Sequence, residues 1–156
     1  MKPHRVVAIG GTFDHFHKGH ESLILKAFQY GERVVIGITS DEFLRRSGKS
    51  GIQPLETRLN KLKDFLIENE LIGRSSLLIL EDPYGPIVRD PTIKGIVVSK
   101  ETLPRAEEAN RMRAVKGVPQ MTVHVIDHIL ASDGRPISST RIRNKEIDEK
   151  GNLISS

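Results

Sequence analysis

The sequence of 156 residues contains no cysteine and no tryptophan, and aromatic residues make up only 4% of it. Without cysteine, the chain can form no disulfide, no thiolate metal site and no thiol nucleophile. The scarcity of aromatic side chains argues against RNA binding, which usually stacks bases on exposed aromatic rings. No apolar run approaches the roughly 20 residues that span a membrane, and no signal-peptide pattern opens the chain. We therefore expect a cytoplasmic protein with no membrane or nucleic-acid partner.

Basic residues outnumber acidic ones in this chain. Lys and Arg together number 24 against 20 Asp and Glu, which gives a net charge of +4 and a pI of about 9.5. This balance suits small polyanions and would also suit nucleic acid, so charge alone does not identify the ligand. The length predicts a single domain covering residues 1–156, which is large enough to bury a core.

An apolar run, two glycines and a helical pattern follow one another near the amino terminus. Val6–Ile9 reads as a strand that stops at Gly10 and Gly11, and apolar residues at helical spacing begin at Leu23. Glycines let a ligand approach the backbone closely, while a helix start offers free N–H groups and the positive end of the helix dipole. The pattern therefore predicts a phosphate-binding strand–loop–helix unit.

Two histidines, His17 and His20, lie at the start of this helix. Imidazoles three residues apart can reach the same anion, and each can donate a hydrogen bond whether neutral or charged. The alternative is a zinc site built from His15, His17, His20 and Asp14, since imidazole and carboxylate both ligate zinc. The glycines and the helix start favour the anion. The loop lacks the Walker and dinucleotide-binding spacings, so it is another kind of phosphate site.

Four further strands and several helices are predicted from apolar patterns. The strands are Val34–Ile38, Ser76–Leu80, Lys94–Ser99 and Met121–Ile126. Strands that alternate with helices predict an α/β fold with a doubly wound five-stranded parallel sheet and helices on both faces. The helix that follows Pro54 has one apolar face, and we expect its polar residues on the other faces: Glu56, Arg58, Lys61 and Lys63. A polar helix is expected over residues 104–115, and a short helix with a loose end beyond Asn144.

A second candidate phosphate site lies near the carboxyl terminus. Ser138, Ser139 and Thr140 are residue types that cap helix starts, and Arg141 or Arg143 would add a guanidinium fork. The alternative is an ordinary capped helix with surface arginines. Two such sites in one chain suit a ligand with several phosphates.

The segment of residues 45–51 is basic and follows the carboxyl end of the second strand. Ligands of open α/β sheets bind at this end, so Arg45, Arg46 and Lys49 could fold over a phosphorylated substrate. The alternative is a solvated basic loop.

Two separate motifs resemble those of a known superfamily. Gly11-Thr12-Phe13-Asp14 with His17-Lys18-Gly19-His20 resembles the GTFD and HxGH signature of the nucleotidyltransferases, and residues 137–143, ISSTRIR, resemble their ISSTxIR signature. Within this superfamily the whole chain, including residues 97–102 and 131–134, resembles the archaeal type of phosphopantetheine adenylyltransferase. The resemblance implies a Rossmann-like sheet with strand order three-two-one-four-five.

The activity that the resemblance implies is adenylyl transfer from ATP to 4′-phosphopantetheine, giving dephospho-coenzyme A and pyrophosphate. Mg²⁺ is expected, bound mainly through ATP phosphates and water rather than by dedicated side-chain ligands. A nicotinamide mononucleotide adenylyltransferase, or another nucleotidyltransferase of small phosphates, is the alternative enzyme. A nucleotide-sensing or RNA-binding module is the alternative outside enzymes. The sequence does not indicate an oligomeric state.

The resemblance also implies roles for individual residues. His20, His17 and Thr12 are expected to act in catalysis, and Thr12 and Lys49 to hold the acceptor phosphate. The expected nucleotide-binding residues are Gly10, Gly11, Thr12, Phe13, His17, His20, Lys100, Asn110, Ser138, Ser139, Thr140 and Arg141. The bacterial form of the enzyme carries arginines after the fourth strand, which this chain lacks. Lys100, Arg111 or Arg113 would have to supply their charge.

Overall fold

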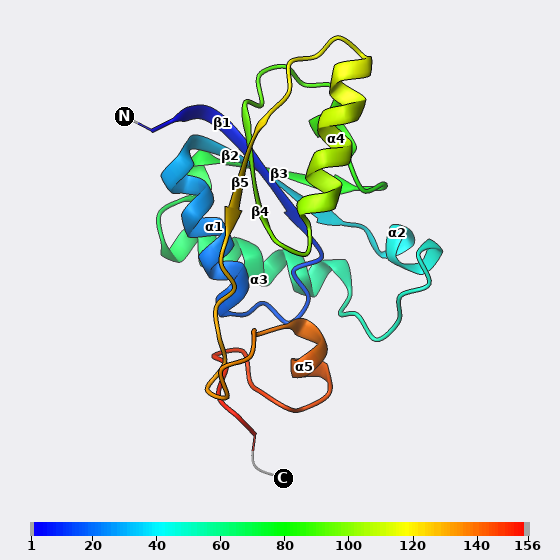
Figure 1. Ribbon diagram of the computed structural model, residues 1–156. Coiled ribbons are helices and arrows are strands. Elements are labelled where there is room, and N and C mark those ends of the chain that lie inside the picture. Colours follow the sequence, from blue (N-terminus) through cyan, green and yellow to red (C-terminus); the bar gives the residue numbers. More distant parts are fainter. Residues whose placement is uncertain (1, 155–156) are drawn as a thin grey trace.

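Five parallel strands form the central sheet of the computed structural model, which describes residues 2–154 (Figure 1). Their order across the sheet is β3-β2-β1-β4-β5, so the predicted fold class and strand order are confirmed. The strands are β1 (His4–Gly11), β2 (Gly31–Thr39), β3 (Ser75–Leu80), β4 (Gly95–Ser99) and β5 (Thr122–Ile126). The register pairs Gly10 of β1 with Gly37 of β2, which brings the carboxyl ends of these strands to one edge of the sheet.

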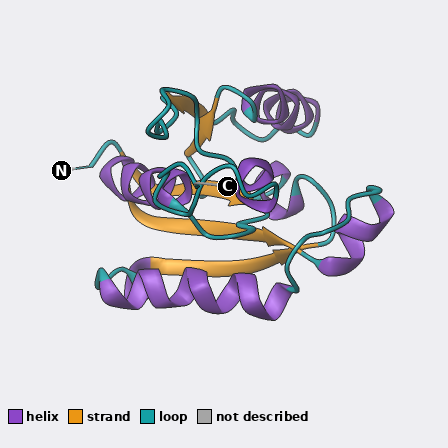
Figure 2. Ribbon diagram, turned by 90° about the horizontal axis from the view of Figure 1, so that it is seen from below, coloured by secondary structure: helices purple, strands orange, loops and turns teal. Residues whose placement is uncertain are grey.

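Helices cover both faces of this sheet, as Figure 2 shows. They are α1 (Lys18–Tyr30), α2 (Asp41–Arg46), α3 (Leu55–Glu68), α4 (Leu103–Val115) and α5 (Ser139–Arg143), with short 3₁₀ turns η1 (Ile72–Arg74) and η2 (Gly85–Val88). Helices α1 and α3 pack with β1 and β2 in one apolar cluster, whereas α4 packs on the opposite side of β1 and β4 in another. The doubly wound arrangement is thus confirmed.

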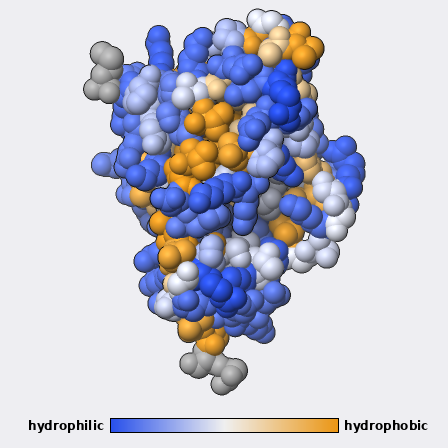
Figure 3. Space-filling model, in the orientation of Figure 1, coloured by the Kyte–Doolittle hydropathy of each residue, from blue (hydrophilic) through white to orange (hydrophobic). Residues whose placement is uncertain are grey.

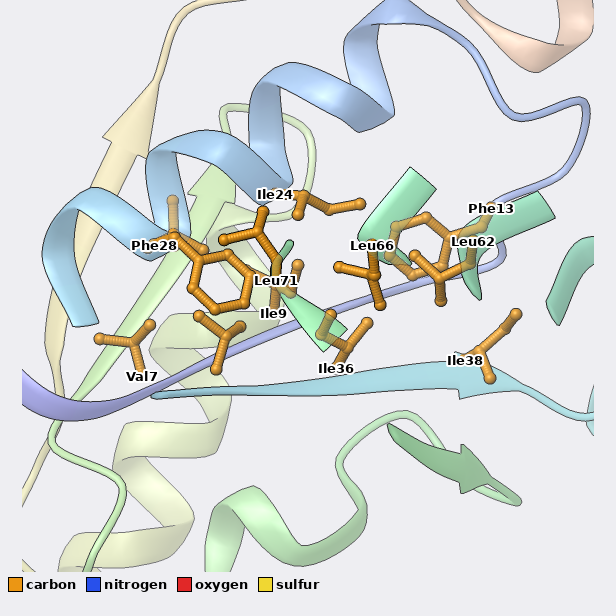
Figure 4. Packing of buried hydrophobic residues seen from close by; sticks show 13 residues of the cluster. Val7, Ile9, Phe13, Ile24, Phe28, Ile36, Ile38, Leu62, Leu66 and Leu71 are labelled. Carbon is orange, nitrogen blue, oxygen red and sulfur yellow. The ribbon is translucent and has the colours of Figure 1, made fainter. Parts of the chain in front are cut away.

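The cluster between the sheet and helices α1 and α3 is the larger of these two cores. Figure 4 shows Val7, Ile9 and Ile36 of the strands pointing toward Ile24, Phe28 and Leu66 of the helices. The central strands β1, β2 and β4 contribute to the clusters on both faces of the sheet, and for this reason their sequences contain continuous apolar runs. The molecular surface seen in Figure 3 is mostly hydrophilic, with a band of hydrophobic residues across it.

The carboxyl-terminal segment differs from the prediction. No helix occurs over residues 144–154; instead Ile147 forms a bridge with Leu153, and Asp148 accepts hydrogen bonds from two backbone N–H groups that follow it. Ile147 is fully buried in a third cluster with Ala131, Ile137 and Ile142. The Glu149 carbonyl accepts from Lys18 N–H, so this segment also contacts the start of α1. Residues 155 and 156 lie outside the described part.

None of the helices in residues 2–154 combines the length and the apolar character that crossing a bilayer requires.

Two arginines are fully buried, although residue type alone predicts exposure for both. Arg58 was expected on a polar face of α3, and this expectation is wrong. Arg113 lies near the end of α4 and donates to four carbonyls: Ile87 O, Asp90 O, Ile93 O and Pro119 O. It therefore binds η2, the turn before β4 and the turn after α4 to one another, and it cannot supply charge to a ligand.

We predict that Arg113→Leu lowers the free energy of unfolding by about 3 kcal/mol or more, because it leaves several buried carbonyls without a donor. Chemical denaturation measures this loss. Arg111→Leu is the matched control two residues away, since Arg111 is exposed and pairs only with Glu108. A surface pair contributes about 1 kcal/mol or less. Equal losses in the two variants would contradict the structural role of Arg113.

Candidate active site

Two pockets open at the carboxyl end of β1 and share Gly10, Gly11 and Thr102. The first, here called the apolar pocket, lies on the α4 side and is lined mainly by Val35, Leu78, Leu80, Tyr84, Ile87, Ile96 and Val98, with Thr12, Thr39 and Arg105. The second, here called the histidine pocket, is lined by polar residues that include His17, His20, Ser99, Glu101, Asp127, His128, Ser138 and Ser139. The glycine pair therefore lies where the two pockets meet.

The packing of the protein does not itself require glycine at these two positions. A Cβ atom at Gly10 or Gly11 would approach the nearest protein atom to 3.6 Å, which is an ordinary contact. At Gly10 this atom would lie beside Gly37 and Leu80, which line the apolar pocket, and at Gly11 beside the ring of Phe13, which lines the histidine pocket. Close approach of a ligand to the backbone is the remaining physical reason for both glycines.

His17 and His20 form a reciprocal cap at the start of α1. His17 is the N-cap residue, and its Nδ1 accepts a hydrogen bond from Gly19 N–H at 3.0 Å. His20 Nδ1 accepts from His17 N–H at 3.1 Å. The two rings stack with their centroids 3.7 Å apart. This arrangement is a capping box in which imidazoles replace the usual serine and glutamate.

The cap determines the tautomer of both histidines. A backbone N–H can donate only to an unprotonated nitrogen, so Nδ1 of each ring carries a lone pair and Nε2 carries the proton. Burial lowers the pKa of His17 to about 4, and it also lowers the pKa of His20 well below its usual value, with a further contribution from His17. Both rings are therefore neutral at pH 7 and line the pocket as Nε2–H donors.

Gly19 is required by the histidine cap. A Cβ atom at this position would lie 2.8 Å from Cε1 of His17, a distance that real structures do not tolerate. The glycine of the HxGH motif thus lets the His17 ring fold back onto the first turn of α1.

Thr12 and Phe13 leave β1 on different sides of the junction. Thr12 lines the apolar pocket, and its hydroxyl lies 3.2 Å from the Thr39 hydroxyl, which donates to it. Phe13 lines the histidine pocket, but its ring is buried in the core 5.3 Å from the ring of His20. Its φ angle of 55° is uncommon for a residue with a side chain. The Phe13 ring supports His20, which leaves only the backbone of Phe13 for a ligand.

The carboxylate of Asp14 joins three segments of the site. It is almost completely buried and accepts from Gln53 N–H and from the Arg143 guanidinium. Ser139 donates its hydroxyl proton to the Asp14 carbonyl at 2.6 Å. The loop after β1, the loop before α3 and the start of α5 are held together in this way.

The structure places only part of the ISSTRIR segment at the pocket. Ser138 caps α5 by accepting from Arg141 N–H, and it lines the histidine pocket together with Ser139. Thr140 is exposed, lines neither pocket and accepts from Arg143. Helix α5 nevertheless begins at the pocket, as the capping residues predict.

Arg141, which is predicted to bind phosphate, is paired with protein groups and lines neither of the two pockets. Its guanidinium pairs with the carboxylates of Asp133 and Glu146 and donates to the Pro136 carbonyl. The Arg141 guanidinium, with the Arg135 N–H, holds the pKa of Asp133 at about 2. Arg141 therefore stabilises the turn before α5. The other candidate, Arg143, pairs with Asp14 rather than lining either pocket.

Asn110, a predicted nucleotide-binding residue, is bonded to the main chain and lines neither of the two pockets. Its side-chain amide donates to Met121 O and accepts from Met121 N–H, so both of its polar atoms bind the chain just before β5. Arg111 pairs with Glu108 on the surface. Lys100 is exposed beside Ser99 and Glu101, which line the histidine pocket, while Lys49 is exposed on its loop, and neither lysine lines a pocket. Of the three cations predicted after β4, namely Lys100, Arg111 and Arg113, only Lys100 is next to residues that line the histidine pocket.

Three residues that contact the candidate site are not predicted as such from the sequence. Arg105 lines the apolar pocket, and its place in the first turn of α4, directly after β4, is the signal that could indicate it. For Asp14, the sequence suggests only a zinc ligand. A buried carboxylate needs hydrogen-bond donors, and those of Asp14 are Gln53 N–H and the Arg143 guanidinium. Arg58 binds the Thr12 carbonyl, and nothing in the local residue types indicated it. Among residues 2–154 no three His, Cys, Asp or Glu side chains are placed to share a metal ion, so this geometry gives the zinc alternative no support.

Comparisons with known proteins agree with this geometry. Residues 8–145 match the family model described as cytidylyltransferase-like. The chain is 45% identical over 153 residues to a phosphopantetheine adenylyltransferase of Methanothermobacter thermautotrophicus, covering 98% of this chain and 92% of that one. It is 44% identical over 145 residues to a protein of the same name from Methanopyrus kandleri, covering 93% and 92%.

A solved structure is also similar. A protein of unknown function from Archaeoglobus fulgidus superposes with a TM-score of 0.70 at 30% identity, covering 79% of this chain and 89% of that one. The chain therefore belongs to the cytidylyltransferase-like family, together with the archaeal phosphopantetheine adenylyltransferases.

Proposed function

We propose that this protein transfers the adenylyl group of ATP to 4′-phosphopantetheine, giving dephospho-coenzyme A and pyrophosphate. The observation that carries the proposal is the junction, at Gly10 and Gly11, of the apolar pocket with the histidine pocket, which is lined by two histidines whose proton is on Nε2. The histidine pocket suits a nucleotide triphosphate, and the apolar pocket suits the uncharged arm of the acceptor. The similarity to enzymes named for this reaction over nearly the whole chain supports the choice of acceptor.

In this mechanism an oxygen of the acceptor phosphate attacks the α-phosphorus of ATP, and the bond from that phosphorus to the oxygen bridging to the β-phosphate breaks. No protein nucleophile takes part. Negative charge develops on the α-phosphate oxygens, and donors that are already in position stabilise it most effectively. We assign His20 and His17 to these oxygens, with His20 as the chief donor, and Thr12 to the attacking phosphate. The backbone of Gly10, Gly11 and Phe13, together with Ser138 and Ser139, would hold the nucleotide.

Charge on the acceptor side has two sources in this proposal. Arg105 lines the apolar pocket directly, whereas Lys49 would have to reach it from an exposed loop. Lys100 would meet the nucleotide phosphates from the end of β4. Mg²⁺, when bound, would neutralise phosphate charge, and Glu101 and Asp127 are the carboxylates that line the same pocket and would receive its water ligands. The proposal retains the expected cytoplasmic location and the two small-molecule substrates.

The proposed reaction is tested by release of pyrophosphate from ATP with a panel of phosphorylated acceptors. In a competition at equal concentrations, we expect dephospho-coenzyme A to predominate over NAD when 4′-phosphopantetheine and nicotinamide mononucleotide are both present. Mass spectrometry of the products decides between them. Predominance of NAD would overturn the acceptor, and absence of pyrophosphate with every acceptor would overturn the activity.

We predict that His20→Ala lowers kcat by about a hundredfold or more, while the Kd for ATP measured by calorimetry changes little. The reason is that a preorganised donor to the developing charge acts mainly in the transition state. His15→Asn is the control, because His15 lines neither pocket and asparagine tolerates its φ angle of 46°. Turnover of His20→Ala near the wild-type rate would refute the assignment.

The low pKa of His17 predicts that acid destabilises the protein. The unfolded histidine titrates at 6.5 and the folded one at about 4, so the unfolded state binds the proton first. The free energy of unfolding should therefore be highest above pH 6.5 and fall toward pH 4, by about 3 kcal/mol from His17 alone. Denaturation curves at several pH values should show a weaker pH dependence for His17→Asn, because asparagine keeps the cap but does not titrate. The same pH dependence in both proteins would contradict this explanation.

A further inference from the structure

Arg58 is a buried cation whose hydrogen bonds converge on the site. Its side chain is 0% exposed, in the first turns of α3. Nη1 donates to Thr12 O at 3.0 Å and to Thr39 O at 2.8 Å, Nε donates to Gln53 O at 2.8 Å, and Nη2 donates to Asp41 Oδ1 at 2.8 Å. Burying a charge is costly, and a buried ion pair adds little net stability. Stability alone therefore does not explain why Arg58 is buried here.

The bonds of Arg58 fix the ends of the two strands that carry the acceptor-side hydroxyls. Thr12 follows β1 and Thr39 ends β2, and both line the apolar pocket. Their carbonyls share one guanidinium nitrogen, and their hydroxyls hydrogen-bond to each other. Arg58 itself lines neither pocket, so it acts on Thr12 through the backbone.

The contact between Arg58 and the Thr12 carbonyl determines the orientation of the peptide unit between Thr12 and Phe13. In a trans peptide the C=O and N–H groups point in opposite directions. Because the Thr12 C=O points to Arg58, the Phe13 N–H points away from it, and within residues 2–154 no protein group accepts this proton. Thr12 lines one pocket and Phe13 the other, which puts this peptide between the two. The φ angle of 55° at Phe13 shows that the turn needs external support.

We propose that Arg58 is a positioning residue of the transfer reaction, which holds the Thr12–Phe13 peptide so that the Thr12 hydroxyl and the Phe13 N–H face the reacting phosphates. The proposal rests on the proposed function. Asp41 completes the arrangement, because its carboxylate pairs with Arg58 and also accepts from Leu55 N–H at the start of α3.

Arg58→Lys tests the proposal, since a lysine keeps the charge but cannot supply the planar set of donors. Under conditions where denaturation curves show the variant to be folded, we expect kcat to fall tenfold or more and KM for the acceptor to rise. The Kd for ATP should stay within about threefold of wild type. Assays use whichever phosphorylated acceptor the wild-type enzyme uses best, so a wrong acceptor assignment would not affect this result.

Arg113→Lys is the matched control, because Arg113 is the other fully buried arginine and none of its four carbonyl partners lies in the loop after β1; of the four, Ile87 alone lines one of the two pockets. It should lose stability while keeping kcat within about twofold. Wild-type kcat in Arg58→Lys, or an equal loss of kcat in both variants, would overturn the proposal. In a Thr12→Val background, Arg58→Lys should lower kcat by a smaller factor than it does in the wild type, because the hydroxyl part of its effect is already lost while the Phe13 N–H part remains.

If Arg58→Lys does not fold, Asp41→Asn replaces it. This change keeps Arg58 but removes the charge of its half-exposed partner, which loosens the guanidinium. We expect a severalfold lower kcat with the Kd for ATP unchanged. An unchanged kcat in this variant would overturn the proposal.

Discussion

The backbone N–H groups of His17 and Gly19 each donate to the Nδ1 atom of an imidazole, and the chemistry of the site depends on these two bonds. They place the proton of each ring on Nε2 and leave both rings neutral, with donors at the histidine pocket. A charged imidazole would bind the ground-state phosphates strongly as well. A neutral donor held in place responds instead to the charge that develops during transfer. In the proposed mechanism, the cap that starts α1 therefore also supplies the donors to the α-phosphate oxygens.

The loop between β1 and α1 cannot hold its own shape, because it contains neither ladder nor helical hydrogen bonds. Two buried charges support it from different sides. Arg58 binds the Thr12 carbonyl, and Asp14 binds Gln53 N–H and the Arg143 guanidinium. Burying a charge costs free energy. Here Arg58 and Asp14 each contact a segment that carries a residue of the candidate site. The positive φ angles of Phe13 and His15 are directly next to these anchors, one on each side of Asp14.

The sequence predicts much of this architecture because the central strands are continuous apolar runs, helices α1 and α3 each have an apolar face, and the loop glycines are distinctive. It predicts less well where residue type and position disagree. Arg58 is three residues after Leu55 and four before Leu62, so the helical period puts it on the apolar face, although arginine is usually exposed. Arg113 continues the buried row of Ala106 and Ala109 in the same way.

Asn110 and Arg141 differ from the sequence prediction in another way, because the structure pairs both with protein groups outside the two pockets. Both residues are polar and close to the site in the chain, and a motif alone cannot tell whether a polar group faces a ligand or another part of the protein. Asn110 satisfies the backbone of Met121, and Arg141 satisfies the carboxylates of Asp133 and Glu146. Met121 is eleven residues from Asn110 in the sequence. Asp133 lies in the turn before α5, and no local sequence pattern specifies the shape of that turn. Only the folded arrangement shows that both residues are already paired.

Nitrogen NMR of the imidazole rings tests the central claim most directly. In uniformly ¹⁵N-labelled protein at pH 7, long-range proton–nitrogen spectra distinguish a protonated from an unprotonated ring nitrogen, and His17→Asn and His20→Gln assign the signals. The structure predicts that His17 and His20 are both neutral, with the proton on Nε2 and a bare Nδ1. A proton on Nδ1, or a cationic ring, in either histidine would contradict this account of the site.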